Sequence, residues 1–270
     1  MKTVVFPNAE PWEKSPFSTL PFFWISKMRH PCAFWSKHLK NLLFLFCIFS
    51  LGYSKVKKDE HVFLLHGLAR TSSSMSGMEK FLQDHNFSVT NLDYPSRKFS
   101  ISELAEQVRK KIAIDPKAQN AEKIHFVTHS MGGILLREIQ KTKPLSNLGR
   151  TVMLGPPNKG SEIVDKLGKL KIFKELNGPA SLQLGTKPHN IPNKLGPVNF
   201  EVCVIAGTQS INPILSQMIP GTDDGKVSVL RAQVEGMKEF IQVKSPHPFL
   251  MNNRTVRKVT LHFLQTGKVP

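Results

Sequence analysis

The 270-residue chain has few of the residues that build disulfide, metal and nucleic-acid sites. Its three cysteines, Cys32, Cys47 and Cys203, are too few for a disulfide framework, and none lies at a metal-ligand spacing. Cys203 sits in an apolar run, where we expect a buried, inert thiol. The sequence has no helix-turn-helix or zinc-finger spacing and no basic stripe interleaved with aromatic residues. These absences argue against a disulfide-stabilised domain, a metal centre and a nucleic-acid partner.

Acidic residues are scarce as well. The chain has 37 Lys and Arg against 20 Asp and Glu, which gives a formal net charge of +17 at pH 7. A positive excess of this size is typical of proteins attracted to an anionic membrane surface. The lysines are scattered singly, however, so an ordinary solvated surface accounts for them equally well. An anionic membrane surface therefore stays open as a partner.

The sequence lacks a hydrophobic run of the roughly 18 residues that a membrane-spanning helix needs. A shorter apolar run, Leu42–Leu51, follows several basic residues and precedes Gly52 and Ser54. This order is typical of a secretory signal peptide, with cleavage after either small residue. We therefore interpret residues 1–58 as an N-terminal extension that holds a signal peptide or a membrane anchor, and we predict an exported protein, periplasmic or secreted.

Two further observations concern the same extension. A signal peptide that begins at Met1 would be unusually long, and Met28 would give a more typical one, so the true start stays open. The alternative is an uncleaved anchor or an intracellular segment. All three tryptophans precede residue 58, so a processed protein should lack tryptophan fluorescence: Trp12, Trp24 and Trp35.

Residues 59–270 alternate short apolar runs with amphipathic helical patterns. Buried strands of mostly apolar residues joined by helices are typical of an α/β domain, in which helices cover both faces of a mostly parallel sheet. We predict strands at 61–65, 87–93, 123–129, 150–154, 200–207 and 240–244. The alternation breaks at about 155–199, where one amphipathic helix (Ile163, Leu167, Leu170) precedes a Gly- and Pro-rich stretch. We interpret this insertion as a small cap over a binding site.

Ser130 stands at the end of the apolar run 123–129 and at the start of a helical pattern. A serine at such a strand-to-helix turn projects its hydroxyl out of the fold, beside the positive end of the helix. The small residues Gly132 and Gly133 relieve crowding at the turn. The usual G-x-S-x-G pattern has glycine where this chain has Thr128. The pattern predicts Ser130 as a nucleophile.

A serine hydroxyl needs a histidine base, and that base needs a carboxylate to orient it. Downstream, the turn 221–227 carries two carboxylates, Asp223 and Asp224. His247 follows the last strand between two prolines that restrict the backbone, which suits a base. The side chain of His129, next to Ser130, is expected to point to another face. We expect the other competing histidines to lie in the core or on the surface: His61, His85, His125, His189 and His262.

The negative charge of a tetrahedral intermediate needs two backbone donors. We predict one at Met131, directly after the nucleophile, and one at Leu68 in the loop after the first strand. Gly67 lets that backbone pass close to a substrate. Arg70 could add positive potential at the mouth of the site, although a solvated arginine is the alternative.

Asp223, beside Asp224, is expected to shape its turn as an Asx-type hydrogen bonder. Four further motifs stand in order along the chain: His66–Thr71, Asn91–Ser96, Thr128–Gly133 and Leu154–Ser161. Together with the Asp224 and His247 turns, they resemble a bacterial family of α/β-hydrolases similar to secreted lipases and esterases, whose members are described as lipase-like hydrolases or acyltransferases. The resemblance runs from about residue 60 to the C-terminus. It implies the α/β-hydrolase fold, with Ser130 as nucleophile, Asp224 as acid and His247 as base.

We therefore predict a serine hydrolase that cleaves carboxylic esters of lipids or other acyl compounds, with neither cofactor nor metal. Three alternatives stay open. The same triad serves acyltransferases, thioesterases and amidases. A hydrolase-like scaffold can also bind lipid or a protein partner without catalysis. A basic surface-binding protein would show salt-dependent association without hydrolysis.

Overall fold

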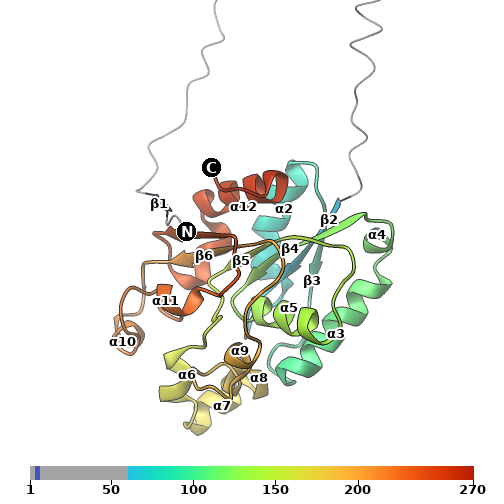
Figure 1. Ribbon diagram of the computed structural model, residues 1–270. Coiled ribbons are helices and arrows are strands. Elements are labelled where there is room, and N and C mark those ends of the chain that lie inside the picture. Colours follow the sequence, from blue (N-terminus) through green and yellow to red (C-terminus); the bar gives the residue numbers. More distant parts are fainter. Residues whose placement is uncertain (1–3, 7–59) are drawn as a thin grey trace, which may run out of the picture. The chain divides into compact units, whose positions relative to one another are not determined.

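The computed structural model describes residues 4–6 and 60–270 (Figure 1). The predicted signal peptide with its two cleavage positions lies outside the described residues, as do Met28, the three tryptophans and the first two cysteines, Cys32 and Cys47. Cys203 is described, and it is fully buried as expected. Burial raises the pKa of its thiol, so the prediction of an inert core cysteine is confirmed.

A seven-stranded sheet forms the centre of the fold, in the order β1-β7-β6-β5-β4-β2-β3. Each neighbouring pair runs parallel, as expected for a doubly covered sheet. The six strands predicted from apolar runs are all present, joined by a seventh, β1. The strands are β1 Val4–Phe6, β2 Glu60–Leu65, β3 Ser88–Leu92, β4 Lys123–His129, β5 Leu148–Leu154, β6 Val202–Gly207 and β7 Glu239–Val243.

β1 belongs to the segment interpreted as an N-terminal extension. Its residues Val4 to Phe6 pair with Ile241 to Val243 of β7 at the edge of the sheet. Cleavage after Gly52 or Ser54 would remove this strand and leave β7 as the edge. Three residues are too few for a periodic pattern, so this pairing could not be predicted from the sequence.

Alternating side chains place hydrophobic residues on both faces of the sheet. In β2, Val62 and Leu64 pack on one face, while Phe63 and Leu65 pack on the other. Figure 1 shows helices on both faces, so the predicted α/β architecture is confirmed. The first face is covered by α2 (Ser76–Asp84) and α12 (Arg254–Thr266), and the second by α3 (Ile101–Ile114) and α5 (Met131–Thr142).

The two longest helices begin at side-chain caps, and one of them ends at a glycine. Ser100 forms a capping box with Glu103 at the start of α3, and the Asn253 side chain accepts from the Val256 N–H at the start of α12. Gly267 directly follows the last residue of α12 and adopts a left-handed conformation, which ends the helix. Outside the insertion, the described fold also has five short helical segments: η1 Ser72–Met75, α4 Pro116–Gln119, α10 Pro213–Ser216, α11 Val229–Ala232 and η2 His247–Asn252.

The insertion at 155–199 contains four short helices, so the prediction of one amphipathic helix there is wrong. The predicted helix is split because α6 ends at Leu167 and α7 begins only after Leu170, whose backbone is extended. Leu170 is 51% exposed instead of contributing to a buried stripe. The four helices are α6 Glu162–Leu167, α7 Lys171–Asn177, α8 Pro179–Leu182 and α9 Ile191–Lys194.

Arg137 of α5 anchors this insertion from inside the fold. The buried guanidinium donates to the Asn158 carbonyl (2.9 Å) and to the Asn158 side-chain oxygen (3.1 Å). It also donates to the carbonyls of Pro192 (3.1 Å) and Gly196 (2.6 Å). Burial lowers the pKa of Arg137 to about 10, so the side chain stays charged at neutral pH. Neutral oxygens at both ends of the insertion thus satisfy one buried cation.

Replacing this cation should destabilise the fold. We expect Arg137→Met to lower the free energy of unfolding by about 2–4 kcal/mol, because buried carbonyls lose their donors. Urea denaturation followed by circular dichroism measures the change. Arg254→Met is the control, since Arg254 is exposed on α12 and should change stability by less than about 0.5 kcal/mol. Equal stability of the two variants would contradict the anchoring role.

Candidate active site

Ser130 occupies the sharp turn between β4 and α5 that the sequence predicts. Its backbone has φ 53° and ψ −123°, which is a strained conformation for a residue with a side chain. The Ser130 N–H donates to the Leu154 carbonyl at 2.8 Å, which holds the turn against β5. Gly132 permits the close approach to β2, because a Cβ there would lie 2.7 Å from the Leu65 carbonyl. This backbone conformation directs the Ser130 hydroxyl away from the sheet.

Asp224 and His247 form a buried hydrogen-bonded pair. His247 Nδ1 lies 2.7 Å from Asp224 Oδ2, and the two residues are 7% and 1% exposed. Because the carboxylate accepts, Nδ1 carries the proton and Nε2 is left as the acceptor. The His247 N–H also donates to the Asp224 carbonyl at 2.9 Å. Asp224 Oδ1 accepts from the N–H groups of Lys226 (3.0 Å) and Val227 (2.9 Å).

The neighbouring carboxylate, Asp223, is used within its own turn. Its Oδ1 accepts from the Gly225 N–H at 2.7 Å, and its Oδ2 accepts from the Ser216 hydroxyl at 2.5 Å. The first contact is the predicted Asx-type hydrogen bond, so that prediction is confirmed. The structure thus separates the two carboxylates: one shapes the turn and the other contacts the histidine.

Gly155 makes room for the Asp224–His247 pair, and sequence reasoning assigned it no role beyond ending a strand. It follows β5 with φ +55°, a left-handed conformation. A Cβ there would lie 3.0 Å from Asp224 Oδ2 and 3.1 Å from His247 Nδ1. Any side chain would therefore press on the two atoms that form the hydrogen bond. The available signal was a glycine placed directly after an apolar strand.

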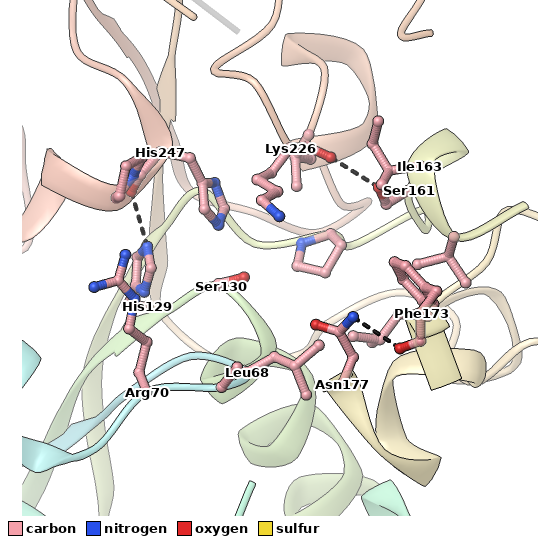
Figure 2. Close-up of a pocket in the computed structure, with 16 residues that line it drawn as sticks. Leu68, Arg70, His129, Ser130, Ser161, Ile163, Phe173, Asn177, Lys226 and His247 are labelled. Atoms are coloured by element: carbon pink, nitrogen blue, oxygen red, sulfur yellow. Dashed lines mark hydrogen bonds between the residues drawn. The ribbon is translucent and has the colours of Figure 1, made fainter. Parts of the chain in front are cut away.

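A cavity of about 400 Å³ opens at the carboxyl ends of the strands. Ser130 and His247 both line it, and Figure 2 shows the Ser130 hydroxyl facing the space that the His247 imidazole also faces. Across the described residues, no hydrogen bond joins these two side chains directly. Asp224 lies behind His247. The structure therefore brings the three predicted residues to one edge of the sheet, with one open face toward a ligand. Apolar side chains form much of the wall: Leu68, Ile163, Val164, Phe173, Leu184 and Val227.

Of the two predicted oxyanion donors, Leu68 lines the cavity and Met131 directly follows Ser130, which lines it. Met131 is the first residue of α5, so its N–H has no intrahelical acceptor. Leu68 lines the cavity, and its N–H has no acceptor in the part of the chain that the structure describes. His66 holds the loop that contains Leu68 in place. Its ring stacks on that of Tyr94 at 3.9 Å, and its carbonyl accepts from the Tyr94 hydroxyl.

His129 lies at the cavity, so the expectation that its side chain points to another face is wrong. Its ring packs against that of His247 at 4.8 Å, and Nε2 donates to the His247 carbonyl at 3.0 Å (Figure 2). Nδ1 is buried without a hydrogen-bond partner. Burial, and next the charge of His247, lower the pKa of His129 well below its usual value. A neutral His129 thus supports the backbone of His247, a role that its adjacency to Ser130 could have suggested.

The other competing histidines lie away from the cavity, as predicted. His61 and His125 are buried in strands, where burial lowers the pKa of each. His85 and His189 are exposed. Thr128, which replaces the usual glycine, is fully buried beside Gly133, where a Cβ would lie 3.2 Å from the Thr128 hydroxyl. The turn therefore accommodates Thr128 because position 133 is glycine.

Residues 4–6 and 60–270 contain neither a metal-binding cluster nor a membrane-spanning helix. Within these ranges, no group of three or more His, Cys, Asp or Glu side chains could hold a metal ion. Within the same ranges, no helix combines the length and apolar character needed to cross a bilayer.

Comparisons with known proteins identify the fold. The family model described as palmitoyl protein thioesterase matches residues 61–190. None of the curated protein sequences compared with this chain matches it. Solved structures of lipases and esterases superpose well at low identity, and the chain therefore has the α/β-hydrolase fold.

Three of these structures illustrate the likeness. The mature form of lipase BlEst2 from Bacillus licheniformis superposes with a TM-score of 0.62 at 16% identity, covering 79% of this chain and 94% of that one. Phospholipase PlaB from Legionella pneumophila gives 0.55 at 17%, covering 64% of this chain and 45% of the other. A metagenomic carboxyl esterase gives 0.56 at 16%, covering 71% and 65%.

The neutral, buried His129 should make the fold sensitive to acid. Because folding lowers its pKa, the unfolded chain binds more protons below about pH 6.5, and stability falls as pH decreases, by up to about 1.4 kcal/mol per pH unit for one such histidine. We expect His129→Gln to reduce this slope between about pH 6.5 and pH 5 in urea titrations. His189→Gln, at an exposed position, is the control and should leave the slope unchanged. An unchanged slope in His129→Gln would mean that the imidazole is charged when folded.

Proposed function

We propose that this chain, an α/β-hydrolase by fold, is a serine hydrolase that cleaves carboxylic esters of lipids or other acyl compounds. The observation that carries the proposal is the 2.7 Å hydrogen bond between Asp224 and His247, beside a cavity that Ser130 lines. A nucleophile at a strained turn, a base oriented by a buried carboxylate and two free backbone donors are the parts that acyl transfer requires.

In the proposed reaction, His247 Nε2 takes the proton of the Ser130 hydroxyl as the oxygen attacks the ester carbonyl. The N–H groups of Leu68 and Met131 donate to the resulting oxyanion, and Asp224 stabilises the imidazolium. Collapse breaks the bond to the leaving oxygen, which receives the proton from His247. Water then attacks the acyl-serine with the same base, and this releases the carboxylic acid and restores Ser130.

The wall of the cavity supports an acyl substrate. Ile163 and Phe173 come from α6 and α7 of the insertion, and Leu184 follows α8. A mainly apolar wall of this kind favours a hydrocarbon chain over a polar one. We therefore propose that the insertion is a cap that binds the acyl part of the substrate.

A second candidate reaction is the hydrolysis of thioesters. It is favoured by the match of residues 61–190 to the model described as palmitoyl protein thioesterase. The same nucleophile, base and oxyanion donors act on an acyl carbonyl whether sulfur or oxygen leaves. Paired oxoester and thioester substrates of equal chain length separate the two reactions.

Ser130→Ala should abolish labelling by a fluorophosphonate probe and lower kcat on p-nitrophenyl esters by about three orders of magnitude or more. The probe forms its bond with the activated serine oxygen, which the alanine variant lacks. Labelling is read by gel fluorescence, and activity is measured over graded chain lengths. Ser102→Ala, at an exposed position on α3, is the control and should be labelled like the parent chain.

The two adjacent carboxylates offer an internal check on the same proposal. Asp224→Asn should lower kcat by about a thousandfold or more, because His247 loses the acceptor that orients it. Asp223→Asn removes a carboxylate from the same turn without touching the histidine, and its loss should be far smaller. Equal losses in the two variants, or persistent labelling of Ser130→Ala, would refute the triad.

We further propose that the exported protein works at an anionic membrane surface, with the outer side of α7 in contact with the lipid. Ile172 and Leu176 are 65% and 57% exposed on this helix, while Phe173 of the same helix lines the cavity. Lys169 precedes these apolar residues and Lys174 lies between them in the sequence. Neither lysine forms an ion pair in the described part of the chain. Exposed apolar residues among lysines are the pattern that anionic lipid binds.

Vesicle co-sedimentation tests this surface. In the full chain, Ile172→Gln combined with Leu176→Gln should weaken binding to phosphatidylglycerol vesicles by about tenfold, because less apolar area enters the lipid. Lys169→Gln combined with Lys174→Gln should weaken it by a similar factor, and this loss should shrink in high salt. Ile114→Gln is the control, since Ile114 is 72% exposed elsewhere on the surface. Unchanged binding in both double variants would contradict the proposal.

A further inference from the structure

The cavity is lined by two cations and by no carboxylate. Lys226 and Arg70 are among its lining residues, and none of the described residues that line it is Asp or Glu. The buried carboxylate nearby, Asp224, already contacts His247. A cavity whose polar wall has one sign of charge attracts ligands of the opposite sign.

The backbone of Lys226 is fixed on both sides by residues of the site. Its N–H donates to Asp224 Oδ1 at 3.0 Å, and its carbonyl accepts from the Ser161 hydroxyl at 2.8 Å. Its ammonium group has no hydrogen bond or ion pair within the described part of the chain. Figure 2 shows the side chain pointing into the cavity on the side of His247. The backbone of Lys226 is therefore held in place, while its exposed side chain is unpaired among the described residues.

Arg70 is positioned by a second constrained loop. The preceding Ala69 has φ 55°, and its N–H donates to the Ser96 hydroxyl at 3.1 Å. That hydroxyl donates in turn to the Arg70 carbonyl at 3.4 Å. The guanidinium has no hydrogen bond or ion pair to any described residue, and Figure 2 shows it beside His129.

The Arg70 guanidinium acts on Lys226 across the cavity. Desolvation lowers the pKa of Lys226, the Asp224 carboxylate opposes this shift, and the Arg70 guanidinium adds to it. An anion bound in the cavity would offset this repulsion and could accept a charge-assisted hydrogen bond from the ammonium group.

We propose that Lys226 and Arg70 form a subsite for an anionic group on the leaving-alcohol side of the substrate. The preferred substrates are then acyl esters whose alcohol carries a phosphate or a carboxylate. This inference rests on the proposed hydrolase function. It assigns the alcohol to this side because the leaving oxygen must receive its proton from His247, and Lys226 borders that histidine. The apolar side chain of Phe173 lies at the opposite end of the cavity in Figure 2, where the acyl chain fits.

A matched substrate pair tests the subsite. The parent full chain, Arg70→Gln and Lys226→Gln are assayed on para-butyryloxybenzoate, which is anionic, and on para-butyryloxybenzamide, which is neutral. Each variant should lose about tenfold in kcat/KM on the benzoate, mainly through KM, and less than about twofold on the benzamide. Raising the salt concentration should weaken the parent's preference. Lys123→Gln is the charge-matched control, because Lys123 is exposed at the opposite end of β4.

Two lipid substrates identify the anion. Short-chain phosphatidylglycerol, which has a net negative charge, and phosphatidylcholine, whose quaternary ammonium offsets the same phosphate, are compared as monomers, and the variants should lose more activity on phosphatidylglycerol. If the variants lose activity on phosphatidylglycerol but not on the benzoate, the subsite recognises a lipid phosphate, and losses on both indicate any anion. Equal losses on charged and neutral substrates, or no losses, overturn the subsite and leave the hydrolase proposal intact. If Ser130→Ala hydrolyses the neutral ester as fast as the parent, or the parent does not hydrolyse it, the hydrolase proposal fails instead.

Discussion

The left-handed backbone at Ser130 is the constraint on which the rest of the site depends. Holding a residue with a Cβ at φ 53° costs about 1–3 kcal/mol, and the hydrogen bond to Leu154 and the close approach at Gly132 maintain it. The same turn raises the serine hydroxyl above the sheet and starts α5, whose first residue is Met131, the proposed oxyanion donor. The conformation of one residue thus positions both the Ser130 hydroxyl and the start of α5.

The parallel sheet explains why residues far apart in sequence meet at this turn. The carboxyl ends of β4 to β7 lie along one edge, so the segments that follow them converge. Ser130 follows β4, Gly155 follows β5, Asp224 comes after β6 and His247 after β7. The close approach is possible because Gly155 has no side chain beside the acid–histidine hydrogen bond. Two cations also line the cavity at this edge, Arg70 from the loop after β2 and Lys226 from the segment after β6.

Long apolar runs and turn residues were enough to predict the six longer strands, the helices on both faces and the strand-to-helix turn at Ser130. The features that sequence reasoning missed depend on contacts between distant residues. β1 is too short for a periodic pattern, and the helices of the insertion are short segments between two points that Arg137 of α5 contacts. Strand alternation predicted the wrong direction for His129 because the left-handed turn interrupts that alternation. The convergence of Ser130, Asp224 and His247 is seen in the structure, while their chemical roles stay predictions.

Arg137 also ties the helix that begins after Ser130 to the insertion. It lies about two turns after Ser130 on α5, and it contacts the chain at Asn158 and again at Pro192 and Gly196. Both ends of the insertion are therefore held by one side chain of α5. A substitution at Arg137 thus acts on the wall of the cavity and on the helix behind Ser130 at the same time.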